Sequence, residues 1–287
     1  LSKRGNIMML EQLLEVLALE PLGEDRFTGI NMHPQGFRVY GGQVLAQAIS
    51  AAHQTVDAER VIHSQHAYFL RQGQSNQPIE YAVERARDGG SFSSRRVVAS
   101  QEGKAVLVSS MSFQLPCEGF DHQPQLPDVA LPEELPTERE RAIAAGDLNE
   151  DFMITTGEDI EVRMVEPVDW RKPEPREGIL HAWTKTTGPL PDTATLHREM
   201  LAYMSDNMLL DAGLIQHGKS YKDRNLQVAS LDHAIWFHQD FRADEWLLQQ
   251  AELERNSGGR TLIRGRFFTR DGLHVATMMQ QGLMRPR

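Results

Sequence analysis

The feature that most constrains this 287-residue chain is a repeat that relates its two halves. The segment His66–Gln72 (HAYFLRQ) matches His233–Gln239 (HAIWFHQ) at an offset of 167 residues. Two glycine matches follow in the same order at an offset of 169, namely Gly89-Gly90 with Gly258-Gly259 and Gly103 with Gly272. A period this long indicates two duplicated domains rather than a solenoid of short repeats. The chain is therefore predicted to fold as two similar halves.

The longest helical segment is Ala194–Gly213, which contains no proline and no glycine before its last residue. Good helix formers dominate it, and apolar side chains occupy most of its circumference, as is typical of a helix buried inside a fold. Asp206 interrupts that pattern, and a buried carboxylate is costly unless partners hydrogen-bond it. We therefore expect either a polar site at Asp206 or a partly exposed Asp at a bend of the helix.

Each half is predicted to combine one such helix with antiparallel strands. In the first half Gly41-Gly42 opens a helix of small residues, which suits close packing on a sheet, and Glu102-Gly103 is typical of a hairpin turn. Apolar and polar residues alternate in the expected strands. In the first half these are residues 63–70, 78–87, 91–101 and 104–114, after a helix at 8–19 and a strand–turn–strand at 27–40. Those of the second half begin at residue 181 and continue over 227–239, 245–254, 261–270 and 273–284. The predicted fold class is α+β, with one central helix wrapped by an antiparallel sheet in each half.

A segment of different composition separates the halves. Five prolines fall between Pro116 and Pro136, among many acidic residues. We predict an N-terminal domain over residues 1–117, a Pro-rich acidic linker over 118–165 and a C-terminal domain over 166–287. Within the linker, the stretch ELPTERERAIAAGDL is compatible with a helix.

Composition argues against several classes of function. A net charge of -10 disfavours a general nucleic-acid binder, which needs a basic surface. The single cysteine, Cys117, cannot form an internal disulfide or a Cys-based zinc site and fits a reducing compartment. No apolar run is long enough for a transmembrane helix, the first residues lack the apolar core of a signal peptide, and LMRPR is not a peroxisomal address. We expect a cytoplasmic protein with no membrane span and no cofactor. No H-E-x-x-H motif is present, so we also expect no metal site.

Several short blocks resemble acyl-CoA thioesterase II, the TesB-type family. Those of the first half are residues 39–44 (VYGGQV), 63–71 (HSQHAYFLR) and 87–97 (RDGGSFSSRRV). Those of the second half are residues 203–206 (YMSD), 230–238 (SLDHAIWFH) and 280–285 (QQGLMR). The resemblance runs from about residue 10 to residue 285. It implies two tandem hotdog domains and the hydrolysis of fatty acyl-CoA to free acid and CoA.

The resemblance also implies which residues act. The family uses an Asp, a Thr or Ser, and a Gln to hold an attacking water, and the matching positions are Asp206, Ser230 and Gln280. Many relatives have Thr at the position of Ser230. Both residues supply a hydroxyl, but the missing methyl leaves the rotamer of Ser230 less constrained. Because Gln281 follows directly, the choice of Gln280 depends on a register that is correct to one residue.

The residue types fit this chemistry. Thioester hydrolysis needs a nucleophilic water and a group that stabilises the oxyanion. Burial would raise the basicity of Asp206 toward the useful range, while Ser230 and Gln280 can orient water without adding charge. Backbone N–H groups at Gly41-Gly42 could serve the oxyanion. The helix that starts there carries no carboxylate, so catalysis is expected to belong to the second half.

Other candidate contacts are less specific. Arg71 and Arg95 could bind the CoA phosphates, although a surface role on the sheet is equally consistent with each. Arg95 and Arg96 are neighbours in a strand, so only one of them should face a given site. By the same geometry Asp232 and His233 should not pair as a hydrolase dyad.

Two other functions stay open at this point. A hotdog hydratase or dehydratase acting on acyl-CoA would pair a catalytic His with an acid near the central helix, whereas the expected companions of Asp206 favour hydrolysis. A non-catalytic acyl-CoA-binding protein would be favoured if Asp206 were lost, and it is present. Protection of edge strands and the family resemblance further predict a homodimer or homotetramer.

Overall fold

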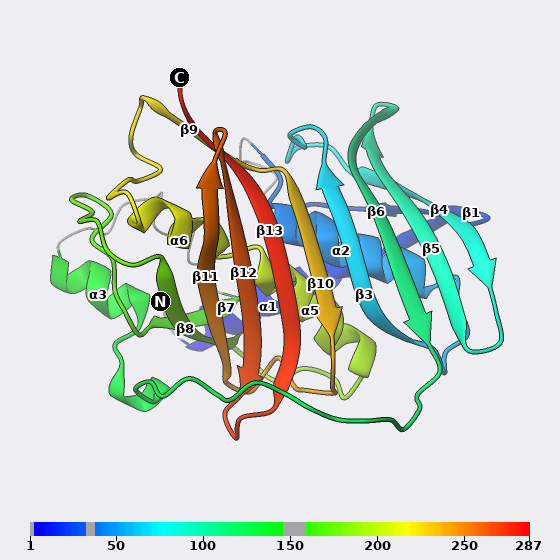
Figure 1. Cartoon of the computed structure of the whole chain (residues 1–287). Coiled ribbons are helices and arrows are strands. Elements are labelled where there is room, and N and C mark those ends of the chain that lie inside the picture. Colours follow the sequence, from blue (N-terminus) through cyan, green and yellow to red (C-terminus); the bar gives the residue numbers. More distant parts are fainter. Residues whose placement is uncertain (1–2, 33–37, 146–158) are drawn as a thin grey trace.

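The computed structural model describes residues 3–32, 38–145 and 159–287 (Figure 1). Its helices are α1 (Lys3–Leu17), α2 (Gly41–His53), the 3-10 helix η1 (Pro132–Glu134), α3 (Glu138–Ala145), α5 (Ala194–Ser205) and α6 (Leu209–Ile215). The strands of the first half are β1 (Glu20–Gly23), β2 (Arg26–Gly29), β3 (Val61–Phe69), β4 (Ile79–Asp88), β5 (Phe92–Gln101) and β6 (Lys104–Gln114). Those of the second half are β7 (Ile160–Met164), β8 (Ile179–Thr186), β9 (Leu226–Ser230), β10 (Asp232–Phe237), β11 (Leu247–Ser257), β12 (Arg260–Thr269) and β13 (His274–Pro286).

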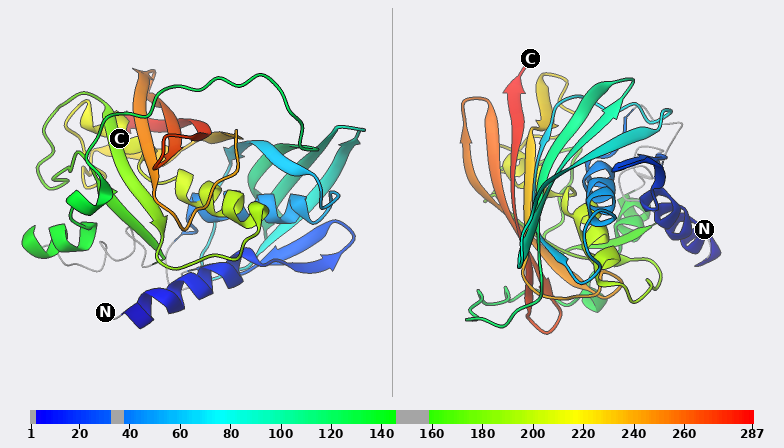
Figure 2. Two further views of the ribbon diagram at one scale, coloured as in Figure 1. Left: turned by 90° about the horizontal axis from the view of Figure 1, so that it is seen from below. Right: turned by 90° about the vertical axis from the view of Figure 1, so that its right-hand side faces the viewer.

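Within these residues the strands form a single 13-stranded antiparallel sheet. Its order is β1-β2-β4-β5-β6-β3-β10-β13-β12-β11-β8-β7, and β9 pairs with β13. The two halves therefore join where β3 pairs with β10. The sheet curves around α2 and α5, which lie side by side on its concave face (Figure 2). The predicted α+β class, with a helix wrapped by an antiparallel sheet in each half, is confirmed.

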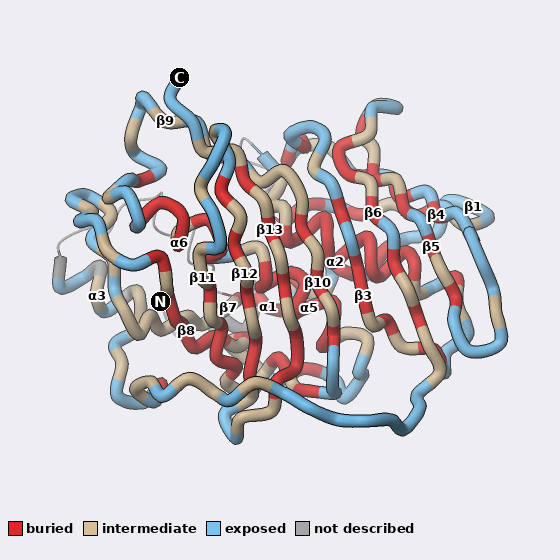
Figure 3. Tube along the Cα trace, viewed as in Figure 1, coloured by how far each residue is buried: buried red, intermediate tan, exposed pale blue. Residues whose placement is uncertain are grey.

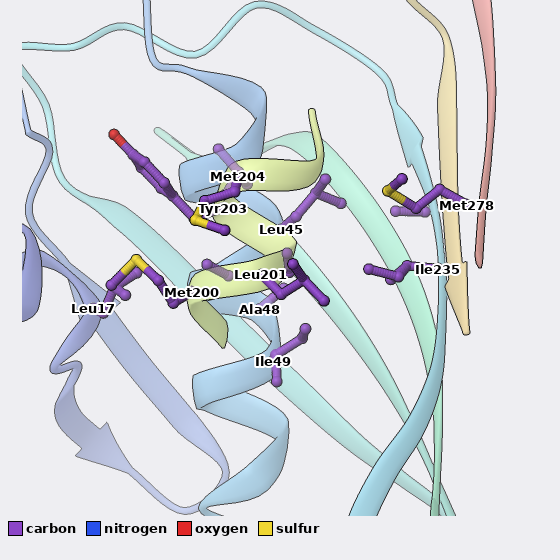
Figure 4. Close-up of a cluster of buried hydrophobic side chains, with 14 of the residues drawn as sticks. Leu17, Leu45, Ala48, Ile49, Met200, Leu201, Tyr203, Met204, Ile235 and Met278 are labelled. Carbon is purple, nitrogen blue, oxygen red and sulfur yellow. The ribbon is translucent and has the colours of Figure 1, made fainter. Parts of the chain in front are cut away.

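The core lies between the sheet and the central helices. Every residue of α2 from Gly42 to Ala52 is buried, and burial follows α2 and the inward side of the strands (Figure 3). Side chains of α2, α5, β10 and β13 meet there, among them Leu45, Leu201, Ile235 and Met278 (Figure 4). Each fully buried aliphatic side chain of this kind contributes roughly 1.5–3 kcal/mol to folding. The Ala- and Gly-rich composition of α2 allows the second helix to pack directly against it.

Tight hairpins connect the long strands, as expected. Glu102 and Gly103 between β5 and β6 have φ of 49° and 71°, and Gly258 and Gly259 between β11 and β12 have φ of 57° and 73°. Positive φ at both central residues matches the right-handed twist of the flanking strands. Glycine is favoured there because it adopts positive φ without steric cost.

The duplication is confirmed, but its register in the joining strands differs by one residue from the sequence match. The match equates His66 with His233. In the structure His66 lies on the outer face, where its ring meets Trp236 edge-on with centroids 5.0 Å apart, while His233 is buried and reaches α5. A slip of one residue moves a strand side chain to the opposite face. The inward counterpart of His233 is Gln65, at an offset of 168, whose amide donates to the backbone of α2.

Two further expectations about elements need correction. Of the strand–turn–strand expected over residues 27–40, only β2 is found; residues 33–37 lie outside the described part, and residues 38–40 lead directly into α2 without a strand. The strand expected over residues 227–239 is divided into β9 and β10 at Leu231. There the backbone N–H of Leu231 bonds to Gln281, and its carbonyl accepts from Phe69 of the other half.

The described part of the expected linker is folded against the second half, and its last residues form β7, which pairs with β8, so the second half begins before residue 166. Leu126, Val129 and Leu135 pack on a cluster of Trp183, Leu248 and Phe268. The Nε1 of Trp183 donates to the carbonyl of Ala130 at 2.8 Å. The expected linker helix corresponds to α3, and residues 146–158 of the linker lie outside the described part. Among the described residues no helix is both long and apolar enough to cross a membrane.

Candidate active site

The expected helix over residues 194–213 is broken at Asp206. The helix α5 ends at Ser205, Asp206 is its C-terminal cap, and Met208 has φ of 67° before α6 begins at Leu209. In one continuous helix the Asp206 carboxylate would share a face with apolar side chains, where its desolvation is unfavourable. The break turns the chain at this point, and Gln249 of β11 donates to the exposed carbonyl of Asn207 at 2.9 Å. The prediction of a single helix is therefore wrong: the chain bends at Asp206, which is partly exposed.

Three side chains from three elements meet at this break. The Nε2 of Gln280, on β13, donates to Oδ1 of Asp206 at 3.1 Å and to Oγ of Ser230, at the end of β9, at 2.9 Å. Ser230 Oγ lies 3.5 Å from the same carboxylate oxygen. Gln280 is fully buried, while Asp206 and Ser230 are partly exposed. The residues named from the sequence thus form one hydrogen-bonded cluster, in which Gln280 rather than Gln281 points inward.

The N-terminus of α2 lies directly against this cluster. A Cβ atom on Gly41 would lie 2.5 Å from Oδ2 of Asp206, and one on Gly42 would collide with the carbonyl of Tyr203. Glycine is therefore required at both positions for α2 to approach the end of α5. The hydroxyl of Tyr40 donates to the same Tyr203 carbonyl at 3.0 Å, and this bond holds the start of α2 against the end of α5. The backbone N–H of Gly42 is hydrogen-bonded to Asp206, so its first partner is the carboxylate, and a role of this turn toward an oxyanion stays a prediction.

Opposed effects set the acidity of Asp206. Burial raises the pKa of Asp206 to about 6, while hydrogen bonds from Gln280, Gly42 and Ser230 limit the rise. The charge of Arg38 also lowers this pKa. A carboxylate with a pKa near 6 is largely ionised at neutral pH and is still a useful base.

Two neighbours of the cluster were not identified from the sequence. His233 contacts Gln280 through Nδ1, at 2.5 Å, and Ser205 through Nε2, at 2.9 Å. In the sequence His233 belongs to the repeat and to a family block, but a chemical role was considered for it only as a possible partner of Asp232. In the structure Asp232 instead accepts from the backbone N–H of Gln281 at 2.8 Å, so the expectation that the pair does not interact is confirmed.

The second neighbour is Arg38, whose side chain is exposed and has no hydrogen bond or ion pair among the described residues. It lies three residues before Gly41 in the short segment that leads into α2. A glycine-rich helix start preceded by Arg was the available sequence signal, but an exposed Arg carries little information until its neighbours are known.

The two arginines proposed from the sequence differ in their surroundings. The guanidinium of Arg95 is buried, and its five N–H groups bond to Thr55 Oγ1, Asp88 Oδ1 and three backbone carbonyls. No donor is left for a phosphate, so the structure argues against Arg95 as a CoA ligand and assigns it to holding β5 against the turn that follows α2. Arg71 is exposed just beyond β3 and donates to the carbonyl of Ala105 at 2.8 Å. Its role in binding substrate stays a prediction.

The first half lacks the amide of the cluster. Gln65 is the counterpart of His233, and its partner across the ladder on β6 is Met111. On β13 the residue beside His233 is Gln280. A thioether at the position of the Gln280 amide cannot donate a hydrogen bond to a water or a carboxylate.

The first half lacks the carboxylate as well. Where Asp206 of α5 meets the N-terminus of α2, the symmetric contact brings His53 of α2 to the N-terminus of α5. The Nε2 of His53 lies 2.9 Å from the hydroxyl of Thr195. Burial lowers the pKa of His53. The two halves share a fold, but only the second carries an acid and an amide at this place.

Comparison with known proteins agrees with this fold. One family model, described as acyl-CoA thioesterase N-terminal domain, matches residues 29–114, and a second, described as acyl-CoA thioesterase, matches residues 171–283. Acyl-CoA thioesterase 2 of Haemophilus influenzae is 36% identical over 96% of this chain and 98% of the relative. Acyl-coenzyme A thioesterase 8 of Rattus norvegicus is 36% identical over 95% of this chain and 88% of the relative. The crystal structure of an acyl-CoA thioesterase II from Mycobacterium marinum matches with a TM-score of 0.79 at 37% identity, over 96% of this chain and 97% of that one. The chain therefore belongs to the acyl-CoA thioesterase family, as a thioester hydrolase built from two tandem hotdog domains.

Proposed function

We propose that this chain hydrolyses fatty acyl-CoA to free fatty acid and CoA with a water held by Asp206, Ser230 and Gln280. The observation that carries the proposal is the bond from the Gln280 amide to both other side chains, at 3.1 Å and 2.9 Å. It gathers one base and two neutral hydrogen-bonding groups at the end of a buried helix. Ser230 Oγ lies 3.5 Å from the carboxylate, at the limit of a hydrogen bond, and accepts from Gln280 at 2.9 Å; we therefore propose water rather than Ser230 as the attacking group.

In the proposed reaction Asp206 takes a proton from water as the water oxygen bonds to the thioester carbonyl carbon. The carbonyl π electrons move to its oxygen, which backbone N–H groups at the start of α2 would stabilise. Collapse of the tetrahedral intermediate breaks the C–S bond and releases the CoA thiolate. The proton held by Asp206 returns to the departing sulfur, and the carboxylate is ready for another cycle.

Hydration or dehydration of acyl-CoA is the weaker alternative. It needs a His that exchanges protons with the substrate. His233 is the histidine bonded to this cluster, and burial lowers its pKa to about 4. Both of its ring nitrogens are engaged by Ser205 and Gln280, which leaves neither free for a substrate proton. A binding protein without activity is disfavoured because it has no need of a carboxylate that Gln280 and Ser230 hold in one hydrogen-bonded cluster.

For the phosphate-bearing end of the substrate we propose Arg38 in place of Arg95. The positive charge of Arg38 lowers the pKa of Asp206 and also that of Tyr221. The Tyr221 ring is 55% exposed and lies 6.1 Å from the ring of Trp170, centroid to centroid. An unpaired guanidinium recognises phosphate oxygens well, and the exposed ring of Tyr221 offers stacking for a base. Together they form a suitable recognition surface for an adenine nucleotide next to the cluster.

The first experiment follows thiol release from palmitoyl-CoA and decanoyl-CoA by the wild type and by Asp206→Asn. Rapid release by the wild type, with loss of two orders of magnitude or more in the variant, is the expected result. Binding of either ester without release would favour the binding protein. Release that survives the substitution would show that the base lies elsewhere.

A second experiment tests direct attack by water. In a single turnover in H2(18)O, the heavy oxygen should appear in the first fatty acid formed. If Asp206 attacked the carbonyl itself and water then opened the mixed anhydride at the Asp206 carbonyl, the first turnover would place an unlabelled oxygen from Asp206 in the fatty acid. Unlabelled first product would therefore replace the water mechanism with a covalent one.

We further propose that the chain works as a homodimer or homotetramer in the reducing cytoplasm. The unpaired Cys117 supports the compartment. Tyr68, 59% exposed, and Trp236 lie on the outer face of the sheet, where β3 and β10 join. Aromatic side chains at the centre of a sheet face are typical of interfaces between chains. Light scattering should give a mass of two or four chains, and a monomeric mass would contradict this proposal.

A further inference from the structure

A hydrogen-bonded relay of uncharged groups lies behind the proposed water-holding residues. It runs from Ser205 Oγ to His233 Nε2 at 2.9 Å, and from His233 Nδ1 to Gln280 Oε1 at 2.5 Å. Ser205, His233 and Gln280 are at most 1% exposed. The relay ends where Gln280 Nε2 meets Asp206.

The requirements of donors and acceptors fix the orientation of the Gln280 amide and the ring proton of His233 in this relay. An ionised Asp206 only accepts, so Gln280 must turn its NH2 group toward it and its Oε1 toward His233. Because Oε1 also only accepts, Nδ1 of His233 must carry the ring proton. Nε2 is then an acceptor. The single proton of the Ser205 hydroxyl has two acceptors at 2.9 Å, the Ala202 carbonyl and Nε2 of His233, and its donation to Nε2 completes the relay.

We propose that His233, held by Ser205 with its proton on Nδ1, is the positioning residue that fixes the amide of Gln280 and so tunes Asp206. This inference rests on the proposed function of the cluster. His233 does not touch Asp206, and it is not a catalytic residue in that sense. Burial keeps it neutral over the working range, since its pKa is lowered to about 4, and a neutral ring has one donor and one acceptor, as the relay requires.

Loss of the Nδ1 proton has a defined consequence. Without a donor at Oε1, the Gln280 amide is free to rotate by half a turn. The rotated amide would place Oε1 against the Asp206 carboxylate, where two acceptors repel each other. Asp206 and the water would then lose a donor. Since the bond from Gln280 lowers the pKa of Asp206, that pKa would rise.

A matched pair of amides separates the two nitrogens of His233. In His233→Asn the amide nitrogen takes the place of Nδ1 and keeps a donor for Gln280. In His233→Gln the amide reaches the place of Nε2 and faces Ser205 instead. We expect the Asn variant to keep kcat within about tenfold of the wild type. The Gln variant should lose roughly 100-fold in kcat at nearly unchanged KM, the usual loss when one oriented donor of an active site is removed.

The pH profile supplies a readout that a merely structural role would not move. The acid limb of kcat/KM should shift to higher pH in His233→Gln and stay in place in His233→Asn. Ser205→Ala, which removes the group that selects the tautomer, should show a smaller loss of kcat with a shift in the same direction. His274→Asn is the control, because His274 is a buried histidine on the same strand as Gln280 and contacts Thr277 and aromatic rings instead.

The outcomes are distinct from those that test the proposed function. Equal kcat losses in the Asn and Gln variants, with unmoved acid limbs, would overturn the positioning role while leaving hydrolysis by the wild type intact. If the Gln variant does not fold, as judged by circular dichroism, Ser205→Ala carries the test, and an unchanged kcat and pH profile there would overturn the inference. Absence of hydrolysis in the wild type would instead remove the proposed function.

Discussion

At the scale of single residues, Asp206 shows how position sets reactivity. The same carboxyl is pushed toward neutrality by burial and toward ionisation by Gln280, Gly42 and Ser230, and its pKa settles at about 6. A general base must be ionised to act, so kcat/KM should fall about tenfold per pH unit below pH ~6 and be flat above it. Assays of decanoyl-CoA hydrolysis between about pH 4.5 and 8 would test this. If the acid limb of kcat/KM instead had its midpoint near pH 4, the Asp206 carboxyl would be solvated during catalysis.

Arg38 leads to a prediction about substrate size. Arg38→Ala should raise KM for decanoyl-CoA by on the order of tenfold, the loss of one charge-assisted phosphate contact. It should leave KM for decanoyl-pantetheine, which lacks the nucleotide, unchanged. The assay belongs at about pH 8, because removal of Arg38 also raises the pKa of Asp206. Arg96→Ala, which removes an exposed arginine paired with Glu84 at 3.5 Å on the outer face, is the control. Equal changes with both substrates would exclude phosphate recognition by Arg38.

Glu199 leads to a prediction about stability. It is 7% exposed on α5, and burial raises its pKa from 4.5 to about 8. Since the folded state binds this proton more tightly than the unfolded state, the contribution of Glu199 to stability falls as pH rises from about 4.5 to about 8. Glu199→Gln carries no charge at any pH. Its Tm should therefore match the wild type near pH 4.5 and exceed it increasingly toward pH 8. A constant difference across this range would show that the carboxyl is solvated.

At the scale of elements, the break between α5 and α6 and the approach of α2 create the site together. The sequence of 194–213 has uninterrupted helix propensity, so local preference favours one helix. The break depends on partners that are distant in sequence, namely the α2 N-terminus, Gln280 of β13 and Gln249 of β11. Tertiary contacts therefore override local propensity at Asp206, where the fold places a charged group at the end of a buried helix.

The unequal halves predict the number of sites. Because Met111 and His53 occupy the first half where Gln280 and Asp206 occupy the second, each chain should bind one acyl-CoA in a reactive position. Isothermal titration with a non-hydrolysable S-alkyl-CoA should give one site per chain. Met111→Ala should leave the site number and kcat/KM at pH 8 nearly unchanged. Two equivalent sites, or a large loss of activity in that variant, would show that the first half takes part.

At the scale of the whole molecule, the two domains are joined by one shared sheet and by the linker between them. The described part of the linker packs on the outer face of the second half through Trp183, which is 1% exposed and bonds to Ala130. Trp183→Ala should lower the free energy of unfolding by roughly 3–5 kcal/mol, as expected when a large aromatic side chain is removed from a packed cluster. Urea denaturation would measure it. Phe120→Ala, which changes a fully exposed aromatic residue of the same segment, should have almost no effect. A small effect of Trp183→Ala would indicate that the linker packs only loosely on the second half.

Much of this architecture can be predicted from local patterns in the sequence. Alternation of polar and apolar residues marks the strands, positive-φ positions such as Gly103 mark the turns, and matched segments in the two halves reveal the duplication. The choice of Asp206, Ser230 and Gln280 came from resemblance of short blocks, which identifies positions but gives no contacts. What the sequence alone determined is therefore the class of fold, its doubling and the residue types available for chemistry, because these depend on periodicity and on short motifs.

Only the tertiary structure decided which of those residues meet. The face of a strand residue depends on register to a single residue, and so His233 and His66, matched in sequence, lie on opposite sides of the sheet. Arg95 is committed to intramolecular bonds that come from an adjacent hairpin and from the end of α2. Long-range contacts of this kind arise when α2, α5 and the shared sheet pack together, and no short stretch of sequence encodes them.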